Sequence, residues 1–340
     1  MLQSTMSDYP LTITSLFKHG ARVYGDSEVV TCTGNHSRRA SFKKVAERVE
    51  KLAAALKRLG IKEGERVATF SWNTQEHQEA YLAIPSMGAV LHSLNIRLYP
   101  EQLAYIINHA EDKIIMVDDS LVPLLARIKD ELKNVREFIV IGDGDATVLG
   151  DALRYEELLA AENTGFDFPD IDERAAAAMC YTSGTSGHPK GVVYSHRSNY
   201  LHSMAETSGA YFGLNEYDRI IPIAPMFHAN AWGLPYAAWL VGADLIMLGK
   251  HLQAGPLCHL IETERPTFAA AVPTIWTDVL RYAEKHKVDF SSFRLVICGG
   301  AAVSKHLVES FQTEHGVEIH QSWGMPETSP LGAASHHPKG

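Results

Sequence analysis

The chain has 340 residues, of which 46% are hydrophobic and 21% charged, an ordinary composition for a globular protein with a large core. Its formal net charge of −9 and its lack of a long basic run argue against nucleic acid as the main partner. No apolar run approaches the roughly 18 residues that a membrane span needs, so we expect no transmembrane segment. No secretory signal is readable at the start of the chain, and the cysteines lack paired spacing. We therefore expect a cytoplasmic protein with buried thiols, at Cys32, Cys180, Cys258 and Cys298.

Strand-like and helix-like patterns alternate along most of the chain. The first series is a strand at 66–71, a helix at 79–93, a strand at 113–118, a helix at 122–132 and a strand at 137–142. The second series has strands at 219–224, 243–248, 267–272, 295–298 and 318–322, and helices at 232–241, 257–264 and 305–315. This alternation predicts an α/β fold with parallel-rich sheets flanked by helices. Polar segments at 142–151 and 161–174 separate the two series, so we expect two α/β sub-domains, at about 1–160 and 175–335.

A loop rich in glycine and hydroxyl side chains follows the apolar stretch 175–181. Glycines let backbone N–H groups approach phosphate oxygens, hydroxyls donate to them, and a lysine adds a movable positive charge. The spacing is not that of a Walker A loop, because the lysine is followed by glycine and a short strand-like run. We therefore expect a phosphate-binding hairpin turn, with a solvated polar turn as the alternative. The loop comprises Thr182, Ser183, Gly184, Thr185, Ser186, Gly187, His188, Pro189, Lys190 and Gly191.

A second cluster follows the strand predicted at 318–322. Trp323 offers a flat face for adenine, Thr328 a hydroxyl for the α-phosphate, and Glu327 a carboxylate for Mg²⁺. A strand-to-loop turn with a solvated glutamate is the alternative. The cluster comprises Gln321, Ser322, Trp323, Gly324, Met325, Pro326, Glu327 and Thr328. Between the two clusters, small residues at the end of a strand let a flat ligand approach the backbone, at Gly300, Ala301 and Ala302.

The segment 225–232 places a histidine among aromatic residues after an apolar strand. His228 lies between Phe227 and Trp232, so we expect its imidazole at the mouth of an apolar pocket, with a purely structural histidine as the alternative. Asn230 and Gly300 complete the expected substrate pocket.

These clusters together resemble the motifs of the adenylate-forming, or AMP-binding, superfamily. The loop resembles its phosphate loop, the segment 323–328 its aromatic-Gly-x-x-Glu-Thr motif, and the segment 225–232 the pocket motif of fatty acyl-CoA synthetases. The resemblance implies that the loop from Thr182 to Gly187, together with Lys190, holds the β,γ-phosphates, and that Thr182 and Glu327 lie at the metal. It also implies that His228 contacts the acyl-adenylate and that Trp232 gates the acyl tunnel. Amino-acid-activating relatives place an aspartate near the histidine, and its absence here argues against an amino acid substrate.

The resemblance implies an ATP-dependent carboxylate–CoA ligase acting on medium- or long-chain fatty acids, with ATP, Mg²⁺ and CoA as cofactors. A carboxylate would first form an acyl-adenylate, and CoA would then displace AMP. We expect His228, Glu327 and Lys190 to be the catalytic residues. Full-length relatives add a third sub-domain and a mobile carboxyl-terminal domain carrying a catalytic lysine. The chain thus resembles the amino-terminal portion of such an enzyme, and we expect the isolated 340 residues to be impaired.

Three alternatives stay open at this point. One is a P-loop phosphotransferase or ATPase, which would release ADP rather than AMP. Another is a fragment that only binds nucleotide or serves in dimerisation, and a homodimer is left open in any case. The third is a ligase for a short or sulfur-containing carboxylate such as a methylthioalkanoate.

Overall fold

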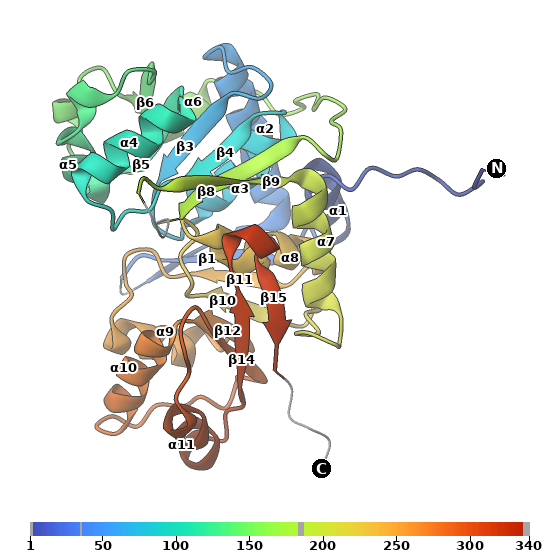
Figure 1. Cartoon of the computed structure of the whole chain (residues 1–340), viewed down its shortest axis with the longest axis vertical. Coiled ribbons are helices and arrows are strands. Elements are labelled where there is room, and N and C mark those ends of the chain that lie inside the picture. The colour runs from blue at the N-terminus through green and yellow to red at the C-terminus, as the bar shows by residue number, and fades with distance from the viewer. Residues whose placement is uncertain (1–2, 35, 183–186, 336–340) are drawn as a thin grey trace.

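The computed structural model describes residues 3–34, 36–182 and 187–335, and Figure 1 shows them as two stacked α/β lobes. One lobe contains a seven-stranded sheet in the order β7 (Leu153–Arg154), β6 (Glu137–Ile141), β5 (Ile114–Asp118), β3 (Arg66–Phe70), β4 (Val90–Ser93), β8 (Ala176–Thr182), β9 (Lys190–Ser195). The other contains an eight-stranded sheet in the order β15 (Leu331–Ala334), β14 (Ile319–Gly324), β13 (Leu295–Cys298), β12 (Phe268–Ala271), β10 (Arg219–Pro222), β11 (Asp244–Met247), β1 (Glu28–Cys32), β2 (Ser37–Ser41).

Neighbouring strands in both sheets are parallel except at the pairs β8–β9, β1–β2 and β14–β15. The prediction of parallel-rich α/β sheets is therefore confirmed. Sheet membership does not follow chain order, however. The early strands β1 and β2 extend the second sheet through β11, and the later strands β8 and β9 complete the first sheet through β4. The expected ranges 1–160 and 175–335 thus do not coincide with the two sheets.

Helices cover both faces of the seven-stranded sheet, because successive side chains of its strands point to opposite sides. Val67 and Met116 belong to the core under α2 (Phe42–Arg58), α3 (Gln75–Ser86) and α6 (Tyr155–Ala160). Their neighbours Ala68 and Val117 face the opposite way and pack with α4 (Pro100–Ala110) and α5 (Val122–Ala126). Successive side chains of a strand point to opposite faces, so both faces of this sheet are covered.

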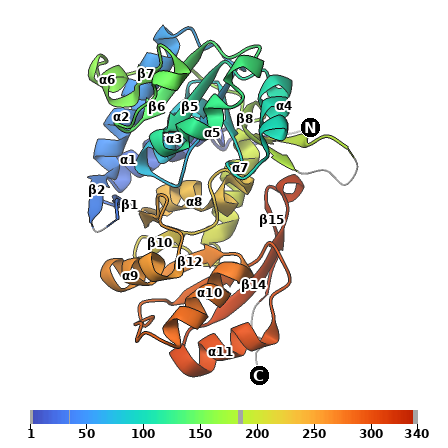
Figure 2. The ribbon, with the colours of Figure 1, turned by 90° about the vertical axis from the view of Figure 1, so that its left-hand side faces the viewer.

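The eight-stranded sheet shares one core with the first lobe. Leu245 and Phe268 point into the same large cluster as Val67, together with α1 (Ile13–Val23) and α8 (Leu234–Val241). On the other face, Ile246 and Ala269 pack with α9 (Ala254–Glu264), α10 (Pro273–Ala283) and α11 (Lys305–His315). Figure 2 shows α8 lying between the two lobes. The shared core therefore fixes one lobe against the other and holds the site between them in place.

Short elements complete the described part of the chain. The helix α7 (His196–Thr207) packs against α8 and α1. The single turns are η1 (Asp119–Leu121), η2 (Lys129–Glu131), η3 (Thr147–Leu149), η4 (Ala229–Gly233) and η5 (Pro326–Thr328). Among the described residues, no helix is both long and apolar enough to span a membrane.

The structure confirms the strand at 295–298 and the helix at 305–315, and corrects two other elements. The helix predicted at 79–93 is wrong in its second half, because α3 ends at Ser86, Gly88 turns the chain with φ 87°, and β4 follows. All of β4 is buried between β3 and β8, and a buried strand lacks the alternation that distinguishes it from a helix. The helix predicted at 122–132 is also too long, since α5 ends at Ala126.

Candidate active site

The glycine-rich loop joins two antiparallel strands. Thr182 at the end of β8 is the register partner of Lys190 at the start of β9. The predicted hairpin is therefore confirmed, and this arrangement differs from a Walker A loop, which leads into a helix. Gly187 is exposed, with φ 103°. The remaining predicted phosphate ligands lie outside the described residues, namely Ser183, Gly184, Thr185 and Ser186.

A cavity of about 550 Å³, here called the hairpin cavity, opens beside the ends of β8 and β9. It brings Thr182 and Lys190 together with Glu327, which lies far away in the sequence. A hydroxyl, an ammonium and a carboxylate thus line one space, and their role as a nucleotide phosphate site with a metal stays a prediction. The cavity is lined by Asn95, Leu98, Gln102, Tyr181, Thr182, Pro189, Lys190, His228, Met325, Pro326 and Glu327.

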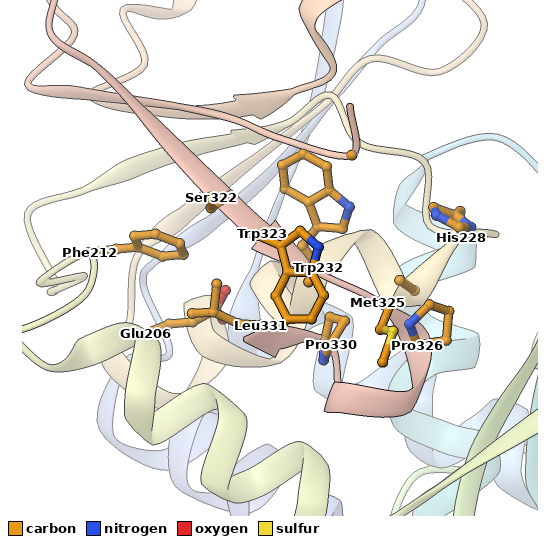
Figure 3. Close-up of a pocket in the computed structure, with 13 residues that line it drawn as sticks. Glu206, Phe212, His228, Trp232, Ser322, Trp323, Met325, Pro326, Pro330 and Leu331 are labelled. Atoms are coloured by element: carbon orange, nitrogen blue, oxygen red, sulfur yellow. The ribbon is translucent and has the colours of Figure 1, made fainter. Parts of the chain in front are cut away.

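A second cavity of about 210 Å³, here called the tryptophan cavity, is shown in Figure 3. The two cavities share His228, Met325 and Pro326 in their walls. The space is bordered mainly by aromatic and aliphatic side chains. It is lined by Glu206, Phe212, His228, Ala229, Trp232, Gly300, Ser322, Trp323, Gly324, Met325, Pro326, Pro330 and Leu331.

The segment around His228 has an unusual backbone. The residues from Ala229 to Trp232 have positive φ angles between 46° and 57°, a conformation that costs about 1–2 kcal/mol per non-glycine residue. This left-handed turn brings Trp232 into the wall of the tryptophan cavity. Asn230 is buried instead, with Nδ2 donating to Asn199 Oδ1 at 3.5 Å, and it is not among the residues lining either cavity.

His228 is exposed where it faces the cavities, but the surrounding protein removes part of the hydration of its ring. This desolvation lowers the pKa of its imidazole below the ordinary value. The ring is therefore neutral near pH 7 and can donate one hydrogen bond and accept another, but adds no positive charge.

The segment after β14 contributes to both cavities. Trp323, Gly324 and Met325 line the tryptophan cavity, whereas Glu327 faces the hairpin cavity. The hydroxyl of Thr328 closes the turn between them, accepting from Met325 N–H at 3.1 Å and donating to the Met325 carbonyl at 2.9 Å. The Thr328 hydroxyl, which the sequence predicts for the α-phosphate, thus forms hydrogen bonds within the turn in this structure.

Some predicted nucleotide-binding residues lie at the edge of this site. Gly300 and Ser322 line the tryptophan cavity. Ala301 and Ala302 are exposed after β13 and are not among the residues lining either cavity. Gln321 lies within β14, where its N–H donates to Ser335 Oγ at 3.0 Å.

Sequence reasoning missed two titratable residues of α7, Glu206 and His202. Glu206 lines the tryptophan cavity and is fully buried, which raises the pKa of its carboxyl well above the ordinary value. His202 is also buried, which lowers its pKa to about 4. Their i, i+4 spacing, which places both on one face of a helix, is the only sequence signal that could have pointed to them.

The family comparison agrees with these motifs. The sequence profile of the family described as AMP-binding enzyme matches residues 17–340. The chain belongs to the AMP-binding enzyme family.

Three curated relatives cover almost all of the AMP-binding chain. A 3-methylmercaptopropionyl-CoA ligase of Ruegeria lacuscaerulensis is 40% identical over 338 residues, 97% of this chain and 62% of the relative. A medium-chain-fatty-acid–CoA ligase of Ectopseudomonas oleovorans is 39% identical over 96% of this chain and 61% of the relative. A long-chain-fatty-acid–CoA ligase of Thermus thermophilus is 43% identical over 96% of this chain and 60% of the relative. The chain therefore spans 60–62% of the length of these relatives.

The fold is also that of solved family structures. An anthranilate CoA ligase in complex with anthranoyl-AMP superposes with a TM-score of 0.89 at 24% identity, covering 98% of this chain and 64% of that one. A long-chain-fatty-acid-CoA ligase from Archaeoglobus fulgidus superposes with a TM-score of 0.85 at 22% identity, covering 98% and 68%. At these identities the likeness establishes the fold of the AMP-binding chain.

Proposed function

We propose that the protein is an ATP-dependent carboxylate–CoA ligase that activates a fatty acid through an acyl-adenylate. The observation that carries this proposal is the pair of adjoining cavities. The hairpin cavity presents Thr182, Lys190 and Glu327, and the tryptophan cavity presents an apolar wall. Because His228 lies in the wall of both, a nucleotide phosphate in one can meet an acyl carboxylate from the other.

The side chains of the hairpin cavity fit a magnesium nucleotide. Among the described residues no group of histidine, cysteine, aspartate and glutamate side chains forms a complete metal cage. Mg²⁺ in nucleotide sites is commonly held by one or two protein oxygens together with the phosphates, and the Glu327 carboxylate and Thr182 hydroxyl provide such oxygens. The Lys190 ammonium would offset phosphate charge.

The proposed reaction has two steps, as the family resemblance implies. A carboxylate oxygen attacks the α-phosphorus of bound ATP and pyrophosphate leaves, giving an acyl-adenylate. The CoA sulfur then attacks the acyl carbon and AMP leaves, giving the thioester. Both steps depend mainly on positioning and charge stabilisation, and the neutral imidazole of His228 can donate a hydrogen bond to the reacting acyl oxygen.

The tryptophan cavity favours a short or medium acyl chain over a long one. Its volume of about 210 Å³ lies below the roughly 300–1,000 Å³ of common small-molecule sites. The relatives named for 3-methylmercaptopropionyl-CoA and medium-chain substrates agree with this size range, whereas the 43% identical relative named for long-chain substrates does not. A methylthioalkanoate therefore stays a second candidate substrate beside a medium-chain fatty acid.

A pyrophosphate-release screen over carboxylates of graded length tests the proposal on the full-length protein. We expect release that depends on both carboxylate and Mg²⁺, AMP as the nucleotide product, and thioester formation once CoA is added. ADP as the product, or no carboxylate dependence at any length, would contradict the proposal and favour a phosphotransferase or a binding protein.

Mg²⁺ dependence, a cytoplasmic location and a homodimer stay predictions. The location is supported by the four cysteines, all of which are buried and unpaired. Fractionation, metal titration and sedimentation of the full-length protein would test these predictions one by one.

A further inference from the structure

Glu206 has no explained role in the proposed reaction. It lies on α7, it is 0% exposed, and neither carboxyl oxygen has a hydrogen-bond partner among the described residues. Burying a carboxyl group without partners destabilises a fold. A partner supplied by a ligand would remove this penalty, and Glu206 forms part of the wall of the tryptophan cavity.

His202 does not fill the partner role. Its Nδ1 lies 3.7 Å from Glu206 Oε2, beyond hydrogen-bond distance. Its Nε2 accepts a hydrogen bond from Leu331 N–H at 3.2 Å, which places the ring proton on Nδ1. Burial lowers the pKa of His202 to about 4 and raises that of Glu206, and both shifts favour the neutral form over an ion pair.

Glu206 lies at the end of the tryptophan cavity that the distal part of an acyl chain would reach. Figure 3 shows Glu206 and Phe212 on the side of the tryptophan cavity opposite His228, with Trp232 and Trp323 between them. His228 borders the hairpin cavity, where the reacting carboxylate would lie. An acyl chain that extends away from His228 therefore passes the two tryptophans and ends near Glu206.

We propose that Glu206 is a specificity-determining residue that hydrogen-bonds a hydroxyl group on the distal part of the acyl chain. The preferred substrate class is then a short or medium hydroxyalkanoate rather than the unsubstituted fatty acid, an inference that rests on the proposed function. A neutral carboxylic acid both donates and accepts, and a hydroxyl group does the same, so each can satisfy the other. A terminal methyl group leaves both oxygens unpaired, and an ammonium requires an ionised carboxylate. Both carboxyl oxygens of Glu206 are buried in the structure, so the Glu206 side chain must rotate toward the cavity when the substrate binds.

The test compares ω-hydroxyalkanoates of graded length with alkanoates that carry a methyl group in place of each hydroxyl. The readouts are pyrophosphate release by the full-length protein and equilibrium binding measured by the fluorescence of the cavity tryptophans. We expect the hydroxyl compound to be preferred about tenfold at the best length, as one good hydrogen bond would give. Glu206→Leu should abolish the preference, Glu206→Gln should keep most of it, and the exposed Glu314→Leu should leave it unchanged as a matched control.

The outcomes separate this inference from the proposed function. Alkanoate turnover with no hydroxyl preference, or a preference that survives in Glu206→Leu, overturns the inference and leaves the ligase in place. A preference for ω-aminoalkanoates that is lost in Glu206→Gln also overturns it, because the carboxyl would then be ionised. Absence of carboxylate-dependent pyrophosphate release with every compound overturns both. An infrared carbonyl band of a protonated carboxylic acid that disappears in Glu206→Gln would support the neutral state without any substrate, and its absence would contradict it.

Discussion

Replacing Glu206 by glutamine should change how the stability of the protein depends on pH. Burial raises the pKa of Glu206 in the folded state well above that of an unfolded glutamate. Between these two pKa values the folded protein binds more protons at this group than the unfolded chain does. The contribution of Glu206 to stability is therefore present at low pH and is lost as pH rises from the unfolded pKa of about 4.3 towards the folded one.

The size of the effect follows from linkage. One bound proton changes the free energy of unfolding by about 1.4 kcal/mol per pH unit, so two units within this window amount to about 3 kcal/mol. Glutamine keeps nearly the same shape and cannot titrate. The stability of Glu206→Gln relative to the wild type should thus rise by this slope as pH increases. His202 and the other buried histidines titrate in both proteins, so the difference between the two curves isolates Glu206.

Urea unfolding of both proteins from about pH 5 to about pH 8 measures this difference. Glu314→Gln, an exposed glutamate on α11, serves as the control and should follow the wild-type curve. A difference curve without slope across this range would show that Glu206 is ionised in the folded protein. The assignment of a neutral carboxyl to the cavity wall would then be wrong.

The other predictions concern the two cavities and the turn between them. Glu327→Gln should lower the adenylation rate at limiting Mg²⁺ about a hundredfold, since loss of one charge-stabilising group costs about 3 kcal/mol, and an unchanged rate would remove Glu327 from the metal site. Trp232→Ala should broaden chain-length preference, measured as kcat/KM across carboxylates, with ATP affinity unchanged; retained selectivity with lost ATP binding would place it on the nucleotide side. Gly324→Ala should lower the midpoint of thermal unfolding by the equivalent of about 1–3 kcal/mol, because a Cβ there would overlap the Pro330 carbonyl oxygen, and an unchanged midpoint would show that the turn relaxes freely.

The parts of the site that the sequence predicted lie on continuous motifs. Thr182 and Lys190 are close because a hairpin joins them, and local composition is enough to indicate such a turn. That Glu327 would meet them followed from the family resemblance, whereas the structure shows the cavity that they share. Glu206 could not be found in this way. It is notable because its buried oxygens lack hydrogen-bond partners, and that depends on tertiary packing. The exchange of strands between the two sheets was missed for a similar reason, since pairing partners distant in the chain leave no local pattern.

The pairing of β1 with β11 has a consequence for how the chain reaches its fold. In the finished sheet β1 lies between β2 and β11, where Val29 is the register partner of Leu245. Until β11 has been synthesised, β1 can therefore pair only with β2. During that interval Val29 and Val30, both buried in the finished protein, belong to a two-stranded ribbon that is marginally stable in water. The unpaired edge of such a segment can form non-native contacts while the rest of the chain is being translated. We therefore expect nascent chains that end before β11 to bind chaperones or aggregate more than chains that extend past it.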